Sequence, residues 1–584
     1  MHSLRLGLLP LLQTFFHISS ILCSTQGHHT TCKATPNDAS WPSISQWTSL
    51  NRTLSGRLLN VLPPASACHT SYPGSNDTCT MIAASWSTFA FHQDNPVSTA
   101  WNNMNSDSCL PDPSAPCSGL GYPVYVVNAS SANDVQLTIN FARENNVRLN
   151  IKASGHDYLK RTSAPYSLSV WTRYMVGGYE YHDEFQPKGC ETTINTTAVT
   201  AGAASYVSDI YYHLNLRNQT VVDGMGPEVT MGGYLTGGGH SPISNIYGLG
   251  SDQVYEVEMV TPAGEIITAN ECQNTDLFWA VRGGGGGTFG VLTKVTVRTI
   301  PSTPIGVYSF KLQTEPNSTV YWDIVAYLLA QFPTLSAANV SAYTYIYPNV
   351  SADELGKHVA SFEGVFALLE PTSPTALEDI WAPFWAHVNE TYPNQTVTRT
   401  TSAVFPNLYS MFLVYADDGG AGVDKVVGSR LLPPEILTDD AFSDALIRFL
   451  GDSGGRLYMV SGNGVWDAEP RGGSDAVNPA WRKALIHAVT TQSWAPHNEA
   501  QQAIVEHDID KVQTEAFRQL VPDSGAYLNE AYWNEPNFQQ AFWGSNYERL
   551  LQIKKVVDPD DVFWCHVCVG SEGWAEVGHS LCRV

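Results

Sequence analysis

One histidine stands at a glycine turn that directly follows a strand-like run. Residues 152–158 are Lys-Ala-Ser-Gly-His-Asp-Tyr, and the run before them is 147–153. Gly155 permits a tight backbone conformation, and successive N–H groups in such a turn can form a nest for a pyrophosphate. His156 would then face whatever the nest holds. Taken alone, the motif is equally compatible with an ordinary surface-loop histidine.

Two glycine-dense segments follow. The first, 231–240, leads into 247–252, and the second is 276–290 with five consecutive glycines. Their glycines alternate with residues that favour burial, which usually marks close backbone approach to a ligand or a strand; a flexible loop or linker is the alternative. Neither segment is a GxGxxG that opens a helix after a strand, and no GK[ST] occurs. The sequence therefore disfavours a nicotinamide Rossmann site and a P-loop.

A possible acid–base group lies near the C-terminus, in Tyr527-Leu-Asn529-Glu530. If the segment is a strand, Tyr527 and Asn529 share one face and Glu530 points to the other. A phenol beside an amide can move a proton and orient a hydroxyl. From these residues alone, an ordinary strand with a buried tyrosine is the favoured interpretation.

The last cysteines have the spacing of a zinc site, Cys565-x2-Cys568-x10-His579-x2-Cys582. In an oxidising compartment such thiols form disulfides instead. With Cys23 assigned to a leader, ten cysteines remain, and we expect five disulfides. The favoured pairs are Cys68–Cys79, Cys109–Cys117 and Cys190–Cys272. The order among Cys32, Cys565, Cys568 and Cys582 stays open, with the expectation that they join the two chain ends.

The N-terminus predicts secretion. Residues 1–27 contain Arg5 and then an interrupted apolar run, which fits a cleaved signal better than a membrane span. We predict a secreted, glycosylated protein that binds no membrane. The sequons are Asn51, Asn76, Asn128, Asn195, Asn218, Asn317, Asn339, Asn349, Asn389 and Asn394.

Composition excludes several classes of protein. The 584 residues include 31 basic and 55 acidic side chains, a net charge of −24, which disfavours nucleic acid as a partner. Charged residues make up only 15% and hydrophobic residues 43%, so the chain is not disordered. Its 46 glycines and 11% aromatics indicate a turn-rich globular enzyme. We expect a monomer that acts on a small molecule.

Local patterns predict the elements that position these motifs. Residues 122–127 and 147–153 resemble strands around a helix that begins with a capping box at 131–134, which makes an α/β unit. Residues 291–297 form another expected strand. The region 303–520 forms a second lobe, and it combines a strand at 341–347 with helices at 321–329 and 476–490. The tail holds a strand at 526–529 and a helix at 547–556.

Together the motifs resemble those of berberine bridge enzyme-like FAD oxidases, in the vanillyl-alcohol oxidase/p-cresol methylhydroxylase superfamily. The resemblance covers about residues 119–300 and 521–566. The motifs occur in the family's order: GHDY, GGYLTGGGH with YGLGSD, CQNTDLFWAVRGGGGGTFGVLT, and YLNE followed by NYERLLQIKKVVDPDDVF.

The resemblance implies an α+β fold: a PCMH-type FAD-binding domain of two subdomains, and a substrate lobe with an antiparallel sheet backed by helices. The expected divisions are a signal peptide (1–27), a disulfide-containing extension (28–118), the FAD-binding domain (119–302), the substrate lobe (303–520) and a C-terminal segment that returns to the FAD domain (521–584).

The resemblance also implies site residues. His156 matches the histidine that joins the flavin 8α-methyl covalently. Gly226-Pro-Glu-Val replaces the Cys-Pro-x-Val that supplies a second bond in many relatives, so a monocovalent FAD is expected. Lys160 stands where relatives have a glycine. The other expected flavin contacts are Ser154, Gly155, Asp157, Gly232, Gly233, Gly238, Gly239, Gly250, Gly285, Gly290 and Val291.

The implied function is oxidation of a small organic substrate, a secondary metabolite, alcohol or carbohydrate. A hydride would pass to flavin N5, Tyr527 or a partner would take the proton, Asn529 would contact flavin or substrate, and O2 would give H2O2. One alternative is a non-redox isomerase or cyclase with Glu530 or Tyr527 as acid/base. Another is a secreted glycoprotein without activity.

Overall fold

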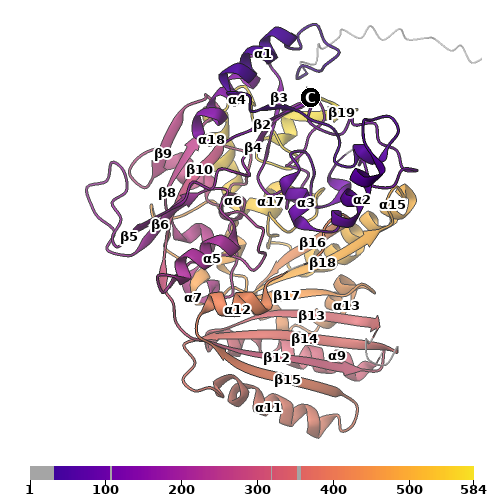
Figure 1. Cartoon of the computed structure of the whole chain (residues 1–584). Helices are drawn as coiled ribbons and strands as arrows, with labels where there is room; N and C mark the ends of the chain where they lie inside the picture. The colour runs from indigo at the N-terminus through magenta and orange to yellow at the C-terminus, as the bar shows by residue number, and fades with distance from the viewer. Residues whose placement is uncertain (1–31, 106–107, 317, 352–356, 418) are drawn as a thin grey trace, which may run out of the picture.

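The computed structural model describes residues 32–105, 108–316, 318–351, 357–417 and 419–584. Two sheets form the upper part in Figure 1, and a single large sheet forms the lower part. The predicted signal peptide and the sequon at Asn317 lie outside the described residues. Within those residues, no helix combines the length and the apolar character needed to span a membrane.

The first sheet is the predicted α/β unit. Helix α4 (Ala132–Glu144) begins at Ser131, whose side chain accepts a hydrogen bond from the Asp134 N–H, so the predicted helix start is confirmed. The reciprocal bond of a capping box is replaced, because the Asp134 carboxylate accepts from the Ser130 N–H at 2.9 Å. The buried face of α4 includes Val135, Ile139 and Ala142, as the periodicity indicated. The strands run in the order β1 (Leu58–Asn60), β2 (Tyr125–Asn128), β4 (Ser167–Trp171), β3 (Arg148–Lys152), with β2, β4 and β3 parallel.

The second sheet is antiparallel and carries the glycine-rich loops. Its order is β5 (Tyr179–His182), β6 (Ala198–Gly202), β10 (Val291–Arg298), β8 (Val254–Val260), β9 (Ile266–Asn270). A short pair, β7 (Gln219–Thr220) and β11 (Ile300–Pro301), lies beside it. The helices of this part are α5 (Val207–Asn215), α6 (Met231–Gly237), α7 (Ser244–Tyr247) and α8 (Thr275–Val281).

The large sheet has seven antiparallel strands. Its order is β15 (Val397–Phe405), β12 (Ile305–Thr314), β14 (His358–Leu369), β13 (Val340–Ser351), β17 (Gly455–Met459), β18 (Ile486–Trp494), β16 (Asp424–Leu432). Figure 1 shows α9 (Thr319–Leu329) and α11 (Ala376–Thr391) against it. The other helices of this region are α10 (Phe332–Ala337), α12 (Leu408–Tyr415), α13 (Phe442–Leu450), α14 (Asn463–Trp466), α15 (Glu499–Asp508) and α16 (Thr514–Leu520).

An aromatic and aliphatic core joins this sheet to its helices. Trp381 of α11 is 1% exposed, and its ring centroid lies 4.5 Å from that of Phe366 on β14. The expected antiparallel sheet backed by helices is therefore confirmed. The expected helix at 476–490 is wrong: Pro479 opens a single 3-10 turn, and the β-branched run after Ile486 belongs to strand β18, which pairs with β17 and with the edge strand β16.

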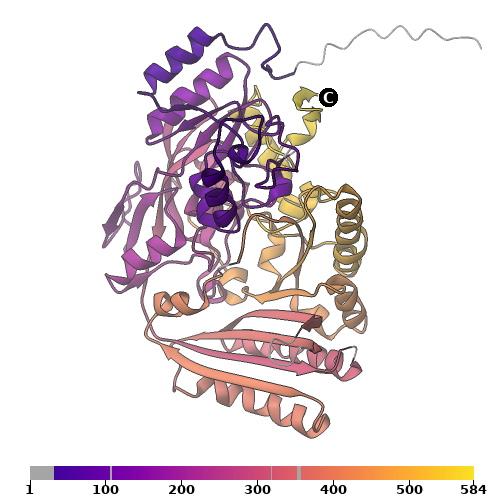
Figure 2. The same cartoon turned by 45° about the vertical axis from the view of Figure 1, so that its right-hand side comes forward.

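The N-terminal extension contributes α1 (Ile44–Thr53), α2 (Asn76–Ser85) and α3 (Phe89–Asp94). In Figure 2 the indigo segment of α2 and α3 lies in front of the two upper sheets. Five disulfides are present among the described residues: Cys32–Cys582, Cys68–Cys79, Cys109–Cys117, Cys190–Cys272 and Cys565–Cys568. The three favoured pairs are confirmed. The zinc spacing is a coincidence, because all three of its cysteines are oxidised.

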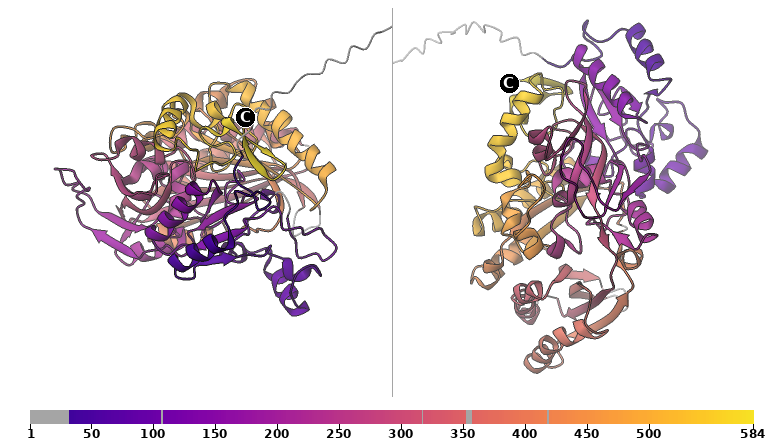
Figure 3. Two further views of the ribbon diagram at one scale, coloured as in Figure 1. Left: turned by 90° about the horizontal axis from the view of Figure 1, so that it is seen from above. Right: turned by 90° about the vertical axis from the view of Figure 1, so that its left-hand side faces the viewer.

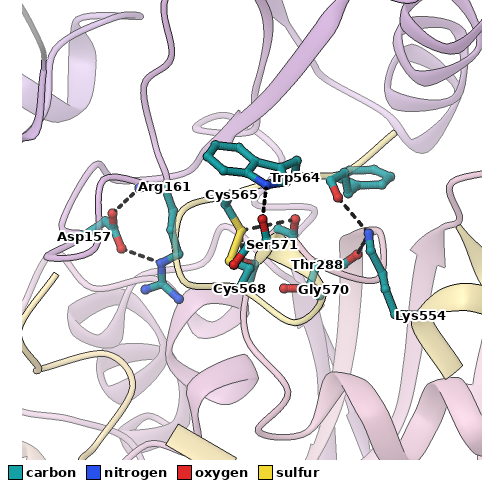
Figure 4. Close-up of a disulfide and its surroundings, with 12 residues drawn as sticks. Asp157, Arg161, Thr288, Lys554, Trp564, Cys565, Cys568, Gly570 and Ser571 are labelled. Carbon is teal, nitrogen blue, oxygen red and sulfur yellow. Dashed lines mark hydrogen bonds and ion pairs between the residues drawn. A yellow bond between two sulfur atoms is a disulfide. The ribbon is translucent and has the colours of Figure 1, made fainter. Parts of the chain in front are cut away.

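The tail, with α17 (Phe538–Trp543), α18 (Tyr547–Val557) and the hairpin β19 (Trp574–Val577) and β20 (Ser580–Arg583), runs back along the upper sheets (Figure 3). One buried lysine fastens it. Lys554 Nζ donates to Thr288 O at 2.9 Å (Figure 4). It also donates to Asp558 Oδ2 at 2.5 Å and to Phe563 O at 2.7 Å. Thr288 belongs to the glycine loop after α8, so this cation joins the tail to a loop nearly 270 residues earlier.

Replacing Lys554 with methionine should destabilise the protein by about 3–5 kcal/mol, because the buried Asp558 carboxylate would lose its cation. The measurement is chemical unfolding of the purified protein. Lys555→Met is the matched control, since Lys555 is the exposed neighbour on the same helix. Equal stability of the two variants would contradict this role for Lys554.

Candidate functional site

A cavity of about 530 Å³ separates the glycine-rich loops of the upper part from one face of the seven-stranded sheet. Its wall on the upper side comes from 151–162, 224–240 and 286–292. Its floor comes from strands β13, β14, β16, β17 and β18, and residues 527–530 close one end. The four sequence motifs therefore meet around one space.

The floor presents its side chains in two cross-strand rows. Tyr343 on β13 pairs with Tyr458 on β17, which pairs with His487 on β18. The second row lies two residues further along each strand, on the same face. There Tyr345 pairs with Arg456, which pairs with Val489. Because alternate residues of a strand share a face, the register places phenols, a guanidinium and an imidazole together on the cavity side.

The predicted strand at 526–529 is wrong. Residues 527–530 form a turn in which the Glu530 N–H donates to Tyr527 O at 2.9 Å. A turn does not send successive side chains to opposite faces, so Tyr527, Asn529 and Glu530 all line the cavity. The expectation that Glu530 points away from Tyr527 is therefore also wrong.

Glu530 is held between two histidines. Its Oε1 lies 3.3 Å from His240 Nε2 and its Oε2 lies 2.9 Å from His487 Nε2. Its side chain is 31% exposed, on the side of the cavity, whereas those of His240 and His487 are 10% and 0% exposed. Burial opposes the charge, but the two imidazoles outweigh it and hold the pKa of Glu530 well below its usual range. The carboxylate is therefore ionised at neutral pH.

The tautomers of these histidines follow from their partners. An ionised Glu530 only accepts hydrogen bonds, so each Nε2 carries a hydrogen. In the neutral form of His240 the other nitrogen, Nδ1, is the acceptor, and it lies 3.3 Å from the Tyr343 hydroxyl. Burial lowers the pKa of His487, which keeps that ring a neutral donor.

Tyr527 and Asn529 form a second hydrogen-bonded group beside Glu530. Asn529 Nδ2 donates to Tyr527 Oη and to Gly233 O, each at 3.1 Å, and Arg161 donates to Asn529 Oδ1 at 3.2 Å. Burial and the nearby Glu530 charge raise the pKa of Tyr527, so its phenol stays neutral. The amide thus fixes a neutral hydroxyl at the cavity.

His156 lies between aromatic rings supplied by the N-terminal extension. Its ring stacks on Phe89 at 4.3 Å and meets the edge of Trp101 at 6.0 Å. Burial lowers the pKa of His156 to about 4, so the imidazole is neutral at pH 7. Its Nε2 is buried and has no hydrogen-bond partner among the described residues.

A buried lysine positions the helix that carries Phe89. Lys152 Nζ, at the end of β3, donates to three carbonyls at the end of α3 and just beyond it: His92 O at 3.0 Å, Gln93 O at 3.2 Å and Asn95 O at 2.8 Å. These carbonyls have no partner inside the helix. Strand β3 therefore leads into the His156 turn and, through Lys152, also fixes the helix whose Phe89 ring stacks on His156.

Lys160 adopts the conformation of the glycine that it replaces. Its φ is 60°, in the left-handed region, and its ammonium lies 3.6 Å from the centroid of Trp533, a cation–π contact that compensates part of the strain. The turn brings Arg161 back to Asp157, which accepts from the Arg161 N–H and Nε, both at 2.6 Å (Figure 4). The loop after the histidine is thus closed without a glycine.

The cavity tests the expected flavin contacts. The residues of this set that line it are Ser154, Gly155, His156, Asp157, Gly232, Gly233, Gly290 and Val291. Gly238, Gly239, Gly250 and Gly285 are not among the residues that line it. A Cβ on Gly239 would lie 2.5 Å from the Tyr234 ring, and one on Gly250 would lie 2.3 Å from it. Those two glycines make room for the ring of Tyr234, which itself lines the cavity.

The residues present fit an FAD. Arg161 lines the cavity, and its Nη1 is buried with no partner among the described residues, as expected of a donor to a phosphate or a flavin carbonyl. The unpaired His156 nitrogen is a second such group. Gly226 lines the cavity at the place of the family's second anchor, and every described cysteine is in a disulfide.

Sequence reasoning missed His240, His487, Tyr343 and Arg456 as site residues. His240 ends the segment 231–240, so its place in a motif was the available signal. The other three have no local signal, because only the register of the large sheet brings them together.

Comparisons with known proteins agree with this geometry. A model of the FAD binding domain matches residues 123–270, and a model described as berberine and berberine like matches 526–569. An "Uncharacterized FAD-linked oxidoreductase" of Arthroderma benhamiae is 34% identical, over 94% of this chain and 96% of its own. The crystal structure of the VAO-type flavoprotein MtVAO615 from Myceliophthora thermophila C1 has a TM-score of 0.84 at 30% identity, over 95% of this chain and 100% of that chain.

A glucooligosaccharide oxidase of Acremonium strictum has the same fold, with a TM-score of 0.59 at 19% identity, over 77% of this chain and 93% of that chain. The chain belongs to the berberine bridge enzyme-like FAD-linked oxidoreductases, in the vanillyl-alcohol oxidase superfamily. It is an FAD-dependent enzyme.

The wall around His156 predicts a pH dependence of stability. His92, in α3, is 1% exposed; Ser98 Oγ lies 2.7 Å from its Nδ1 and Trp86 O 2.6 Å from its Nε2. Burial lowers the pKa of His92 from 6.5 to about 4. Between pH 6.5 and 4, His92 is therefore protonated in the unfolded chain but neutral in the folded chain. The free energy of unfolding falls by about 3 kcal/mol as the pH falls through this window.

His92→Gln should flatten that decline in thermal or urea unfolding measured from pH 7 to 4. His507→Gln, at an exposed position of α15, is the control and should leave the slope unchanged. An unchanged slope in His92→Gln would show that other groups cause the acid sensitivity.

Proposed function

We propose that the protein is a secreted oxidase that carries FAD on His156 through one covalent bond and oxidises a small organic substrate, with O2 as acceptor and H2O2 as product. The observation that carries the proposal is that one cavity holds both His156, a neutral imidazole with an unpaired nitrogen, and the ionised Glu530 between its histidines. A flavin anchor and an acid–base group on one space are what such an oxidase needs.

Bound FAD would supply the two-electron chemistry, taking hydride from the substrate and returning the electrons to O2. The chain supplies the proton acceptor. Glu530 takes the Nε2–H hydrogen bond of His240, so the acceptor side of the neutral ring is Nδ1, beside the Tyr343 hydroxyl. The substrate hydroxyl gives its proton to that Nδ1, and the Glu530 charge stabilises the imidazolium that forms. This assignment moves the base from Tyr527 to the His240–Glu530 pair.

The other side chains orient the reacting group. Tyr527 accepts from Asn529, so its own hydrogen is free to bond a substrate oxygen. Tyr343, next to His240 Nδ1, can hold the same oxygen from the sheet side. Each is a neutral hydroxyl, so neither competes with His240 for the proton.

Secretion and glycosylation belong to this proposal. They are supported by the interrupted apolar N-terminus, the sequons and the five disulfides, which persist in oxidising compartments. A covalent bond would prevent loss of FAD after export, where no pool exists to refill the site. The substrate class in this proposal is a secondary metabolite, an alcohol or a carbohydrate.

The flavin should remain with the acid-denatured native chain, on the peptide that contains His156, and His156→Asn should release it. Mass spectrometry of the digested protein makes the measurement, and no cysteine peptide should carry flavin. Flavin freed by trichloroacetic acid from the native chain would disprove the covalent bond.

Glu530→Gln should slow anaerobic reduction of the flavin by about 10²–10⁴-fold, because the His240 imidazole would lose the charge that stabilises its protonated form and general-base catalysis would be weakened. Tyr527→Phe should slow it less, since it removes one orienting hydrogen bond, and the exposed Glu499→Gln is the control. Stopped-flow absorbance reports the rate. Native-like reduction in Glu530→Gln would overturn the assignment. Conversion of substrate while the flavin stays oxidised and no H2O2 forms would favour the isomerase.

A further inference from the structure

Arg456 occupies the centre of the cavity floor without a charged partner. It lies on β17 between Tyr345 and Val489 of the adjacent strands, and it lines the cavity. Its guanidinium makes no hydrogen bond and no ion pair with any described residue. The guanidinium carbon lies 5.9 Å from the centroid of the Tyr345 ring, a cation–π contact. The charge is therefore left free on the side where a ligand would lie.

Other arginines of the interior are paired. Arg482 contacts Asp252 at 2.7 Å and Asp475 at 3.0 Å, and Arg518 contacts Glu535 at 2.8 Å. Arg456 differs from these residues, because it has no such partner among the described residues and lies half-buried in the wall of the cavity.

The nearby carboxylates do not pair with this cation. Asp417 lines the cavity, but it lies outside ion-pair distance of Arg456, and its Oδ1 accepts from the Gly419 N–H at 3.2 Å. Glu530 is held by two histidines. Glu363, in the same row of the sheet, pairs with Lys311 at 3.0 Å. The missing acceptor is thus one that a ligand would bring.

We infer that Arg456 is an anion-binding subsite and that the substrate is a planar, aromatic alcohol with a carboxylate. This rests on the proposed function. Arg456 is two residues from Tyr458, so the two rows of the floor are roughly 7 Å apart. The carboxylate lies at Arg456, and the oxidisable hydroxyl lies at the other row, near His240 and Tyr343. The rings of Tyr345 and Tyr458, which meet edge to face at 6.4 Å, line the same floor and would contact the aromatic body of the substrate.

The class of probe follows from this spacing. A carboxylate pairs with guanidinium through charge-assisted hydrogen bonds, which an amide of the same shape cannot match. Benzoate and benzamide are two matched probes, a carboxylate and an amide of the same shape. Neither has an oxidisable hydroxyl, so binding is measured without turnover. We expect benzoate to perturb the flavin absorbance of the holoenzyme at concentrations about 10- to 100-fold lower than benzamide does.

Arg456→Met should remove the preference for benzoate and leave the benzamide affinity unchanged, because it keeps the side-chain length and loses the charge. Arg456→Lys should keep part of the preference. The control is Arg448→Met, at an exposed position of α13, which should behave as the native protein. If Arg456→Met fails to fold, Arg456→Gln gives the same comparison.

Equal affinity for benzoate and benzamide in the native protein, or an equal preference for benzoate in Arg456→Met, would overturn the inference. The proposed oxidase fails on a different result, the absence of flavin reduction and H2O2 with any oxidisable substrate. Binding of benzoate through Arg456 can be present or absent independently of that result.

Discussion

A carboxylate in the interior of a protein needs donors around it, and Glu530 receives them from two distant segments. His240 ends the glycine-rich segment of the upper part, and His487 is fixed by the register of β18 in the large sheet. They are 290 and 43 residues from Glu530 in sequence. The site exists only where these three segments meet, so the returning tail, the glycine loops and the sheet are mutually dependent. The ionised side chain is the point at which their positions are coupled.

The sequence predicted those parts whose signals are local. The turn at His156, the capped helix after Ser131 and the strand at 291–297 are each determined by a few adjacent residues, and all are present. The segment 526–530 was assigned wrongly, because four alternating residues fit a strand and a turn equally. The contacts of Glu530 with two remote histidines decide between them, and no local pattern contains that information.

The same reasoning explains the other differences. The helix predicted at 476–490 overlaps the start of β18, where the β-branched residues favour a strand that pairs with β16 and β17. The cysteine and histidine spacing at the end of the chain matched a zinc site. Its three cysteines form disulfides instead: Cys565 with Cys568, and Cys582 with Cys32. Arg456 carried no sequence signal at all, since its importance comes from what surrounds it.

The disulfide between Cys32 and Cys582 closes the chain into a loop whose two ends are 550 positions apart in sequence. A protease that cuts once at any exposed turn within this loop releases no fragment, because both pieces stay joined through the sulfur bridge. The bridge also forms only after synthesis has passed Cys582. The extension that contributes Phe89 and Trp101 to the surroundings of His156 is therefore fastened, at Cys32, to a segment that is made 550 positions later.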